Sequence, residues 1–242
     1  MEALKCPMDI DALLEIVREE VSNRYGDGLN CLAYCKVLLE ALKLLGAYDA
    51  QELVVRAVVL GKSTDFDYLQ NMHPSQLVQL CDRACVHSAA NSTIEIELTK
   101  PDSTERTKVT IPYRTVGYTH GAGELGELSD GQWSGHIVIV YNNHLIDPTI
   151  GQLNSEKFGI LFNPPYILLA GGDQKIGEEH FLYTANQEHF IAYETYPDER
   201  SYLSSKSWSD TIFVDELFEV ATRVVEHYQA NLFSEQSVDT ND

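Results

Sequence analysis

Cys31, His136 and Asp147 are the residues whose types and positions could together carry out nucleophilic chemistry. Cys31 follows Asn30, a good helix N-cap, and begins an apolar stretch that is typical of a helix and ends before Gly46. The unpaired N–H groups and the dipole at a helix start stabilise negative charge, and so favour the thiolate of a cysteine there. The sequence therefore predicts a reactive thiol at Cys31. The simpler alternative is a small buried core cysteine.

His136 and Asp147 stand at the two ends of a predicted β-hairpin. His136 begins the segment HIVIVY, and Asp147 ends the segment HLID. If Asn142 and Asn143 form a two-residue turn, Val138 faces Asp147, and His136 becomes a diagonal neighbour of Asp147 on the same face. A three-residue loop would place the two side chains on opposite faces. Taken alone, each residue also fits a purely structural role at a strand end.

An aspartate beside a histidine would give this pair a chemical function. The carboxylate fixes the tautomer of the imidazole ring and stabilises its protonated form. A histidine held in this way can in turn keep a nearby thiol as the thiolate. The three residues therefore predict a cysteine nucleophile with a histidine base that an aspartate orients.

The elements that would position these residues follow from the periodicity of the apolar residues. Helices are expected near 9–23, 31–45, 74–86 and 211–230, and strands near 52–60, 92–100, 108–113, 136–141, 144–147 and 166–170. The strands 92–100 and 108–113 are expected to form one hairpin, and residues 180–196 are expected to form another. Because helices come first and antiparallel strands later, the pattern indicates an α+β fold with a central helix, 31–45, packed on an antiparallel sheet.

The chain shows no internal linker or repeat, so one domain is predicted over residues 1–233. The polar, acidic tail 234–242 is predicted to be disordered. Residues 120–132 are expected to form a flexible loop before His136. Gly121, Gly123 and Gly126 in this loop satisfy a dinucleotide-binding spacing, but Glu124 and Glu127 would repel a pyrophosphate.

Two stretches of the chain resemble the transglutaminase-like branch of the papain-like cysteine enzymes. From Asn30 to Leu60, the sequence is similar to the family's Cys-led helix, its Leu-Gly break and the strand that follows. The second stretch, GHIVIVYNNHLIDPT, is similar to the family's histidine strand and its Asp-Pro-Thr strand. The chain also has the family's order of cysteine, histidine and then aspartate.

The resemblance implies a papain-like (transglutaminase-like) fold with three catalytic residues. Cys31 would be the nucleophile, His136 the general base and acid, and Asp147 the residue that orients the ring. The sequence departs from animal transglutaminases, which have a tryptophan upstream of the cysteine, because its tryptophans are Trp133 and Trp208. Residues 61–132 match no part of the family pattern.

The activity implied is that of a thiol hydrolase or acyltransferase that needs no cofactor. Cys31 would attack an amide or acyl carbonyl and form a thioester. Amide hydrolysis, by a peptidase or a glutamine deamidase, ranks first, and transamidation and acetyl transfer share the same intermediate. The alternative is a protein-binding module that retains the fold without turnover.

The composition limits the partners. With 17 basic and 37 acidic residues, the net charge is −20, which argues against binding to nucleic acids or to anionic membranes. A protein or peptide substrate is expected, and a basic one suits this charge. The N-terminus lacks the basic and apolar run of a signal peptide, and no apolar stretch could span a membrane. A cytoplasmic location is therefore expected, although export without a classical signal stays open.

The five cysteines also raise the question of a zinc site. Cys31 and Cys35 form one CxxxC pair, and Cys81 and Cys85 form another, so four thiolates could bind zinc. Both pairs lie in apolar helical patterns, whereas structural zinc sites more often use CxxC loops. Buried core positions are therefore favoured for Cys35, Cys81 and Cys85, and no metal is expected.

Overall fold

The computed structural model describes residues 8–26, 31–61, 92–99, 106–117, 135–171, 176, 181–185 and 190–238. The helices are α1 (Ile10–Tyr25), α2 (Cys31–Leu44), α5 (Lys206–Ser209) and α6 (Thr211–Val238). The strands are β1 (Gln51–Leu60), β2 (Ser92–Thr99), β3 (Arg106–Gly117), β4 (His136–Tyr141), β5 (His144–Asp147), β6 (Ile167–Ala170), β7 (Phe181–Ala185) and β8 (Phe190–Tyr196). The 3-10 helices are η1 (Ile150–Leu153), η2 (Glu156–Phe158) and η3 (Ser201–Ser204). Predictions for Asn30, Cys81, Cys85, the helix 74–86 and the loop 120–132 lie outside the described residues.

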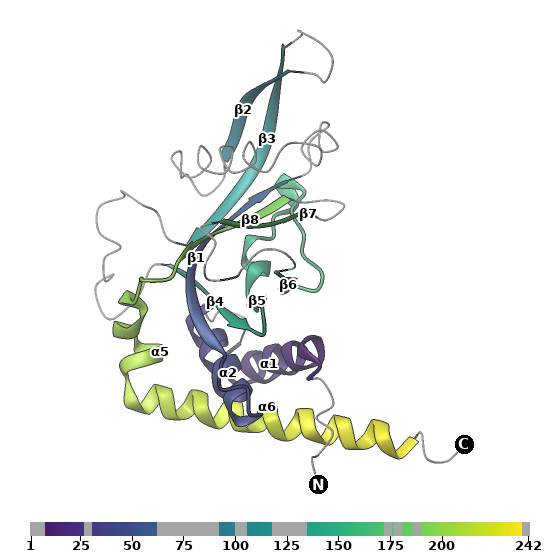
Figure 1. The fold of residues 1–242 in the computed structure, drawn as a ribbon, viewed down its shortest axis with the longest axis vertical. Helices are drawn as coiled ribbons and strands as arrows, with labels where there is room; N and C mark the ends of the chain where they lie inside the picture. The colour runs from purple at the N-terminus through teal and green to yellow at the C-terminus, as the bar shows by residue number, and fades with distance from the viewer. Residues whose placement is uncertain are drawn as a thin grey trace.

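The described strands form one eight-stranded sheet, and the strand pairs are antiparallel. Its main order is β2-β3-β1-β4-β5-β6, and β8 pairs with both β1 and β7. The predicted hairpins β2–β3 and β7–β8 are present. Helices α1, α2 and α6 lie together at one end of the molecule, and the β2–β3 hairpin projects at the other (Figure 1). The predicted α+β class is confirmed.

Strand β1 is the centre of the sheet, and two strands share one of its edges. Along that edge, β4 pairs with the first half of β1, up to Val55 opposite His136. From Arg56, which pairs with Gly117, the same edge is occupied by β3. Strand β8 covers the other edge. His136 therefore begins a new strand beside the middle of β1, at the point where β3 ends.

The hairpin between β4 and β5 has the predicted two-residue turn. Asn142 and Asn143 have φ angles of 49° and 56°, which is typical of a type I′ turn. Tyr141 pairs with His144, as this turn requires. This register puts His136 and Asp147 on the same face of the sheet, so the prediction that depended on it is confirmed.

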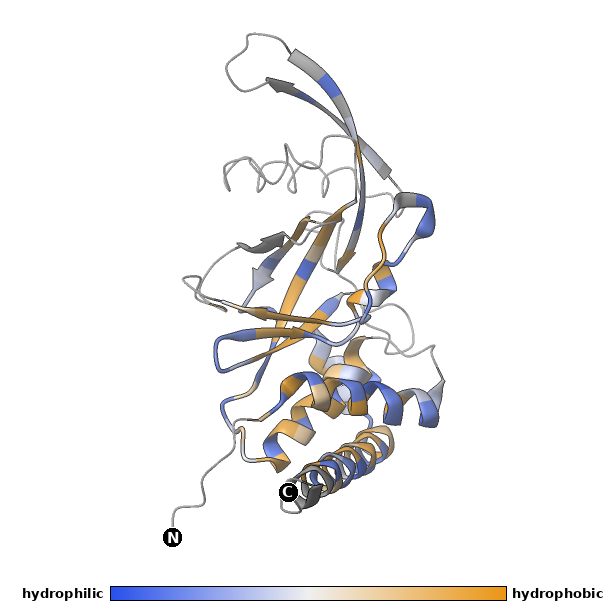
Figure 2. Ribbon diagram, turned by 90° about the vertical axis from the view of Figure 1, so that its right-hand side faces the viewer, coloured by the Kyte–Doolittle hydropathy of each residue, from blue (hydrophilic) through white to orange (hydrophobic). Residues whose placement is uncertain are grey.

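Helix α2 is buried along most of its length, as its sequence predicts. Its charged residues form one stripe, in which Lys36 and Lys43 lie 2.9 Å and 3.8 Å from the carboxylate of Glu40. Apolar residues predominate along the central strands, and the helices carry apolar and polar residues on different sides (Figure 2). One apolar cluster joins the helices to the sheet face of Ile137 and Ile139. The cluster on the other face is formed by Leu53, Val55, Ala57, Val59, Val138, Val140, Leu145, Ile150, Leu153, Ile160, Phe162, Ile191 and Tyr193.

Helix α6 packs against both α1 and α2. The backbone N–H of Asp9, the N-cap of α1, donates to the hydroxyl of Tyr228 in α6 at 2.9 Å. The helix continues to Val238, beyond the predicted end at residue 230, because no glycine or proline interrupts the sequence there. The predicted boundary at residue 233 therefore falls inside a helix, and residues 239–242 lie outside the described part. None of the described helices has both the length and the apolar character needed to cross a bilayer.

Candidate active site

Cys31 is the first residue of α2, at the point where this helix meets the start of β4. Its side chain is 4% exposed. The sulfur donates to the carbonyl oxygen of Gly135, the residue before His136, at 3.7 Å. The apolar helix α2 packs on β4, and this packing brings the N-terminus of α2 to the first residue of β4. The thiol therefore lies beside the predicted histidine, at a helix end that favours negative charge.

His136 and Asp147 form a buried hydrogen bond. Nε2 of the ring lies 2.8 Å from Oδ2 of the carboxylate, and both side chains are 0% exposed. The predicted contact between these two residues is confirmed. A buried carboxylate on Nε2 fixes the ring so that Nδ1 is the nitrogen left for chemistry.

Asp147 is held by two further residues. The hydroxyl of Tyr193, in β8, donates to Oδ2 at 3.1 Å. The backbone N–H and the hydroxyl of Thr149 lie 3.0 Å and 3.4 Å from Oδ1. The Thr149 contact is the local turn that Asp-Pro-Thr favours, and the sequence could have indicated it. Tyr193 lies 46 positions from Asp147 in the sequence, and no local sequence pattern indicated this contact.

Arg18 links α1 to the segment that follows Asp147. Its guanidinium donates to the carbonyl oxygen of Pro148 at 2.6 Å. The same guanidinium lies 5.7 Å from the centre of the Tyr34 ring in α2. A cation over an aromatic face is attracted to it. Both helices of the first fifty residues therefore support the end of β5, a role that the sequence did not indicate.

Gln152 is a further polar contact of the pair, and no sequence pattern predicted it. Its Nε2 lies 3.0 Å from Nδ1 of His136. It belongs to η1, which follows β5 after Pro148 and Thr149. A glutamine sixteen positions from the histidine, in a short 3-10 helix, gives no sequence pattern that distinguishes it from a surface residue.

The charges around His136 favour its protonated form. Burial by itself would lower the pKa of His136. The negative charge of Asp147, the hydrogen bond with it, and the hydrogen bond and charge of Cys31 act together against burial. Together they raise the pKa from its usual 6.5 to about 10. An imidazolium is thus stabilised between a carboxylate and a thiol, as a cysteine nucleophile requires.

This raised pKa predicts a stability that depends on pH. The folded protein binds the His136 proton more tightly than the unfolded chain does. The stability that this proton contributes is therefore complete below about pH 6.5. It should be lost as pH rises toward about 10, and the loss should be on the order of a few kcal/mol. Urea unfolding between about pH 6 and about pH 10 measures it. In His136→Gln, the free energy of unfolding should depend less steeply on pH. An equally steep dependence in that variant would show that another group is responsible.

Cys35, one turn after Cys31, has a different environment. It is fully buried, and its sulfur donates to the carbonyl oxygen of Ile137 at 3.1 Å. Burial raises the pKa of its thiol well above the usual range, and the charges of Cys31, Asp147 and Glu52 add to this. The predicted core role of Cys35 is confirmed. In the described part of the chain no group of histidine, cysteine and carboxylate side chains could hold a metal ion; Cys81 and Cys85 lie outside it.

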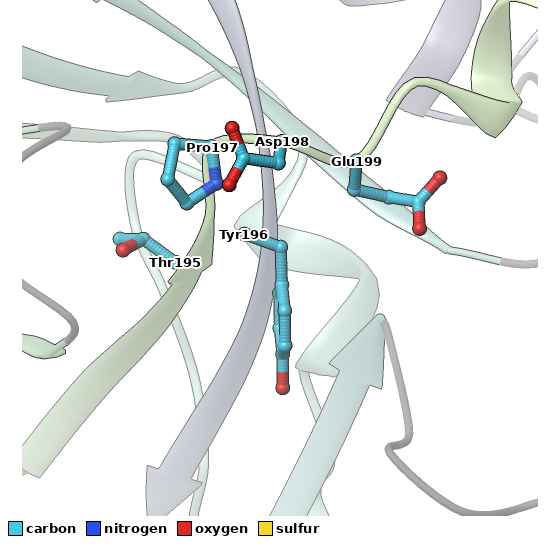
Figure 3. Close-up of a pocket in the computed structure, with 5 residues that line it drawn as sticks. All are labelled: Thr195, Tyr196, Pro197, Asp198 and Glu199. Carbon is cyan, nitrogen blue, oxygen red and sulfur yellow. The ribbon is translucent and has the colours of Figure 1, made fainter.

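A pocket of about 290 Å³ opens at the end of β8. It is lined by Thr195, Tyr196, Pro197, Asp198 and Glu199 (Figure 3). The Tyr196 ring and the Glu199 carboxylate point in different directions, so these groups do not converge on one position (Figure 3). None of the three predicted catalytic residues lines this pocket, and we assign it no role in the chemistry.

Comparisons of the chain with protein-family models, with curated proteins and with solved structures gave no match.

Proposed function

We propose that this protein is a cysteine-nucleophile enzyme that acts on an amide or acyl carbonyl through a thioester. The observation that carries the proposal is the buried hydrogen bond between His136 and Asp147 beside the Cys31 thiol. The raised pKa of His136, to about 10, supports it, because the ring is then ready to act as an acid toward a leaving group. The transglutaminase-like form of the papain-like fold is part of the same proposal. A cysteine-led helix packed on the histidine strand supports it.

In the first half of the reaction, the Cys31 sulfur attacks the carbonyl carbon of the substrate. Because Nδ1 of His136 carries a proton near neutral pH, the sulfur attacks as the thiolate that this imidazolium stabilises, and its electron pair forms the new S–C bond. The negative oxygen that results needs hydrogen-bond donors. The first N–H groups of a helix have no acceptor within it, so the main-chain N–H of Cys31 is suited to this role. The tetrahedral intermediate collapses when His136 gives its proton to the departing amine.

In the second half, water or another amine attacks the thioester. Neutral His136 takes the proton of the attacking group, and the sulfur departs as the thiolate. We rank amide hydrolysis of a protein or peptide first, as in a peptidase or glutamine deamidase. Transamidation and acetyl transfer differ only in the acceptor that reaches the thioester. The net charge of −20 favours a basic substrate.

Thiol labelling tests the proposal without a known substrate. Cys31 should react with iodoacetamide faster than Cys35 by at least about tenfold near neutral pH, because imidazolium at His136 stabilises its thiolate. Cys35 should stay protected, because burial raises its pKa. Peptide mapping by mass spectrometry at timed intervals gives both rates. Cys31 labelled no faster than Cys35 would count against catalysis and would favour a binding module.

A further inference from the structure

The side chain of Gln152 contacts Nδ1 of His136, the ring nitrogen that the proposed chemistry uses. Nε2 of His136 is committed to Asp147 at 2.8 Å, so only Nδ1 can exchange a proton with Cys31. The side-chain amide of Gln152 lies 3.0 Å from that same Nδ1. His136 is fully buried, whereas Gln152 is an exposed residue. An exposed side chain therefore reaches inward to contact a buried ring.

The backbone that carries Gln152 is fixed by several contacts. Arg114 of β3 donates to the carbonyl oxygens of Leu153 and Asn154, at 3.0 Å and 2.7 Å. The N–H of Gly151 donates to the carbonyl oxygen of Pro165 at 3.0 Å. A side chain at Gly151 would place its Cβ only 2.5 Å from Cβ of Pro165, so the close approach requires a glycine. The position of Gln152 is thus set by the fold.

A carboxamide suits a ring that must change its protonation state. When Nδ1 is unprotonated, the amide N–H of Gln152 can donate to it. When Nδ1 carries a proton, the amide can turn over and accept with Oε1. A carboxylate could serve only the protonated ring, an ammonium group only the neutral ring, and a thioether would be a weak acceptor.

We propose that Gln152 is a positioning residue that holds Nδ1 of His136 in both protonation states, so that the ring stays directed toward Cys31 while a proton passes between them. This inference rests on the proposed function. As the S–H bond of Cys31 breaks, its proton binds Nδ1 and the electron pair stays on sulfur. The new N–H then lies within reach of both the thiolate and the turned amide oxygen.

The other titratable groups around the ring are few among the described residues. Helix α2 contributes Cys31 and, one turn later, Cys35, while β5 contributes Asp147. Strand β8 contributes Tyr193, which contacts Asp147. Gln152 differs from all of them because its side chain does not titrate, and its amide can donate or accept. Removal of the Gln152 amide should therefore disturb the orientation of the His136 ring more than it changes the pKa of the ring.

The titration of His136 tests this directly. Proton-detected NMR of the imidazole in a Cys31→Ala background follows the ring without the thiol. Gln152→Met should change the pKa of His136 by less than about half a unit, because hydrogen bonds to the two forms have similar net strength. Gln152→Glu should raise it by about one to two units, because the carboxylate favours only the protonated ring. A shift of a full unit or more in Gln152→Met would overturn the proposal.

Labelling of Cys31 in the otherwise unaltered protein gives the second measurement. Gln152→Met should slow iodoacetamide labelling of Cys31 by about five- to tenfold, because one hydrogen bond that orients the ring is lost. The control is Gln229→Met, at an exposed glutamine of α6, which should leave both the rate and the titration unchanged. An unchanged rate in Gln152→Met would overturn the positioning role. If Cys31 is unreactive in the parent protein, the proposed function fails, and the NMR titration still decides whether Gln152 serves both forms.

Discussion

Cys31→Ala should abolish thioester formation and lower turnover by roughly 10⁶-fold, because no other described thiol lies beside His136. Intact-mass analysis after incubation with a panel of acyl donors should show an acyl adduct on the parent protein and none on the variant. Only one small group at a helix end is removed, so urea unfolding should show little change in stability.

The matched control is Cys35→Ser, one turn further along α2. The sulfur of Cys35 already donates to the carbonyl oxygen of Ile137, so a serine hydroxyl would have a buried partner. The cost in stability should therefore stay near or below about 1 kcal/mol, and acylation should be retained. If Cys35→Ser were stably folded and inactive while Cys31→Ala remained active, the nucleophile would be Cys35.

Asp147→Asn is expected to lower the rate by roughly 10²–10⁴-fold. The amide would place either an oxygen or an NH₂ group against Nε2 of His136, and neither supplies the negative charge that stabilises the imidazolium. The pKa of His136, now raised to about 10 mainly by Asp147 against the effect of burial, should fall as well. Steady-state kinetics measures the rate, and NMR titration of the imidazole measures the pKa.

Tyr193→Phe is the control for this substitution. It removes the hydroxyl that donates to Oδ2 of Asp147 but keeps the carboxylate and its contact with His136. The loss of rate should be less than about tenfold, the cost of one hydrogen bond. Activity of Asp147→Asn within tenfold of the parent would show that Asp147 supports structure and not chemistry.

The predicted part of the site depends on local patterns. The register of β4 and β5 follows from Asn142 and Asn143, which adopt the positive φ angles of a two-residue turn more readily than most residues. Period-two alternation then puts His136 and Asp147 on one face. The position of Cys31 follows from the apolar pattern of its helix. Each inference used neighbouring residues only, and for that reason the sequence was sufficient.

The unpredicted part depends on contacts between distant segments. Arg18 meets Pro148 across 130 positions, and Tyr193 meets Asp147 across 46. No periodicity links such residues, because their meeting is decided by how α1 and β8 pack. Gln152 is near His136 in sequence, but η1 must first be fixed by Arg114 of β3. Strands β3 and β4 share one edge of β1, and this arrangement is likewise a result of tertiary packing.

The contact of α6 with α1 and α2 has a consequence for how the chain folds. The N-cap of α1 meets Tyr228 across 219 positions, and α2, which carries Cys31, is also covered by α6. Contacts between such distant positions form slowly, because a long loop must close before they contribute. The sides of α1 and α2 that face α6 therefore stay exposed until α6 packs on them. We expect slow refolding and a tendency to aggregate on the way.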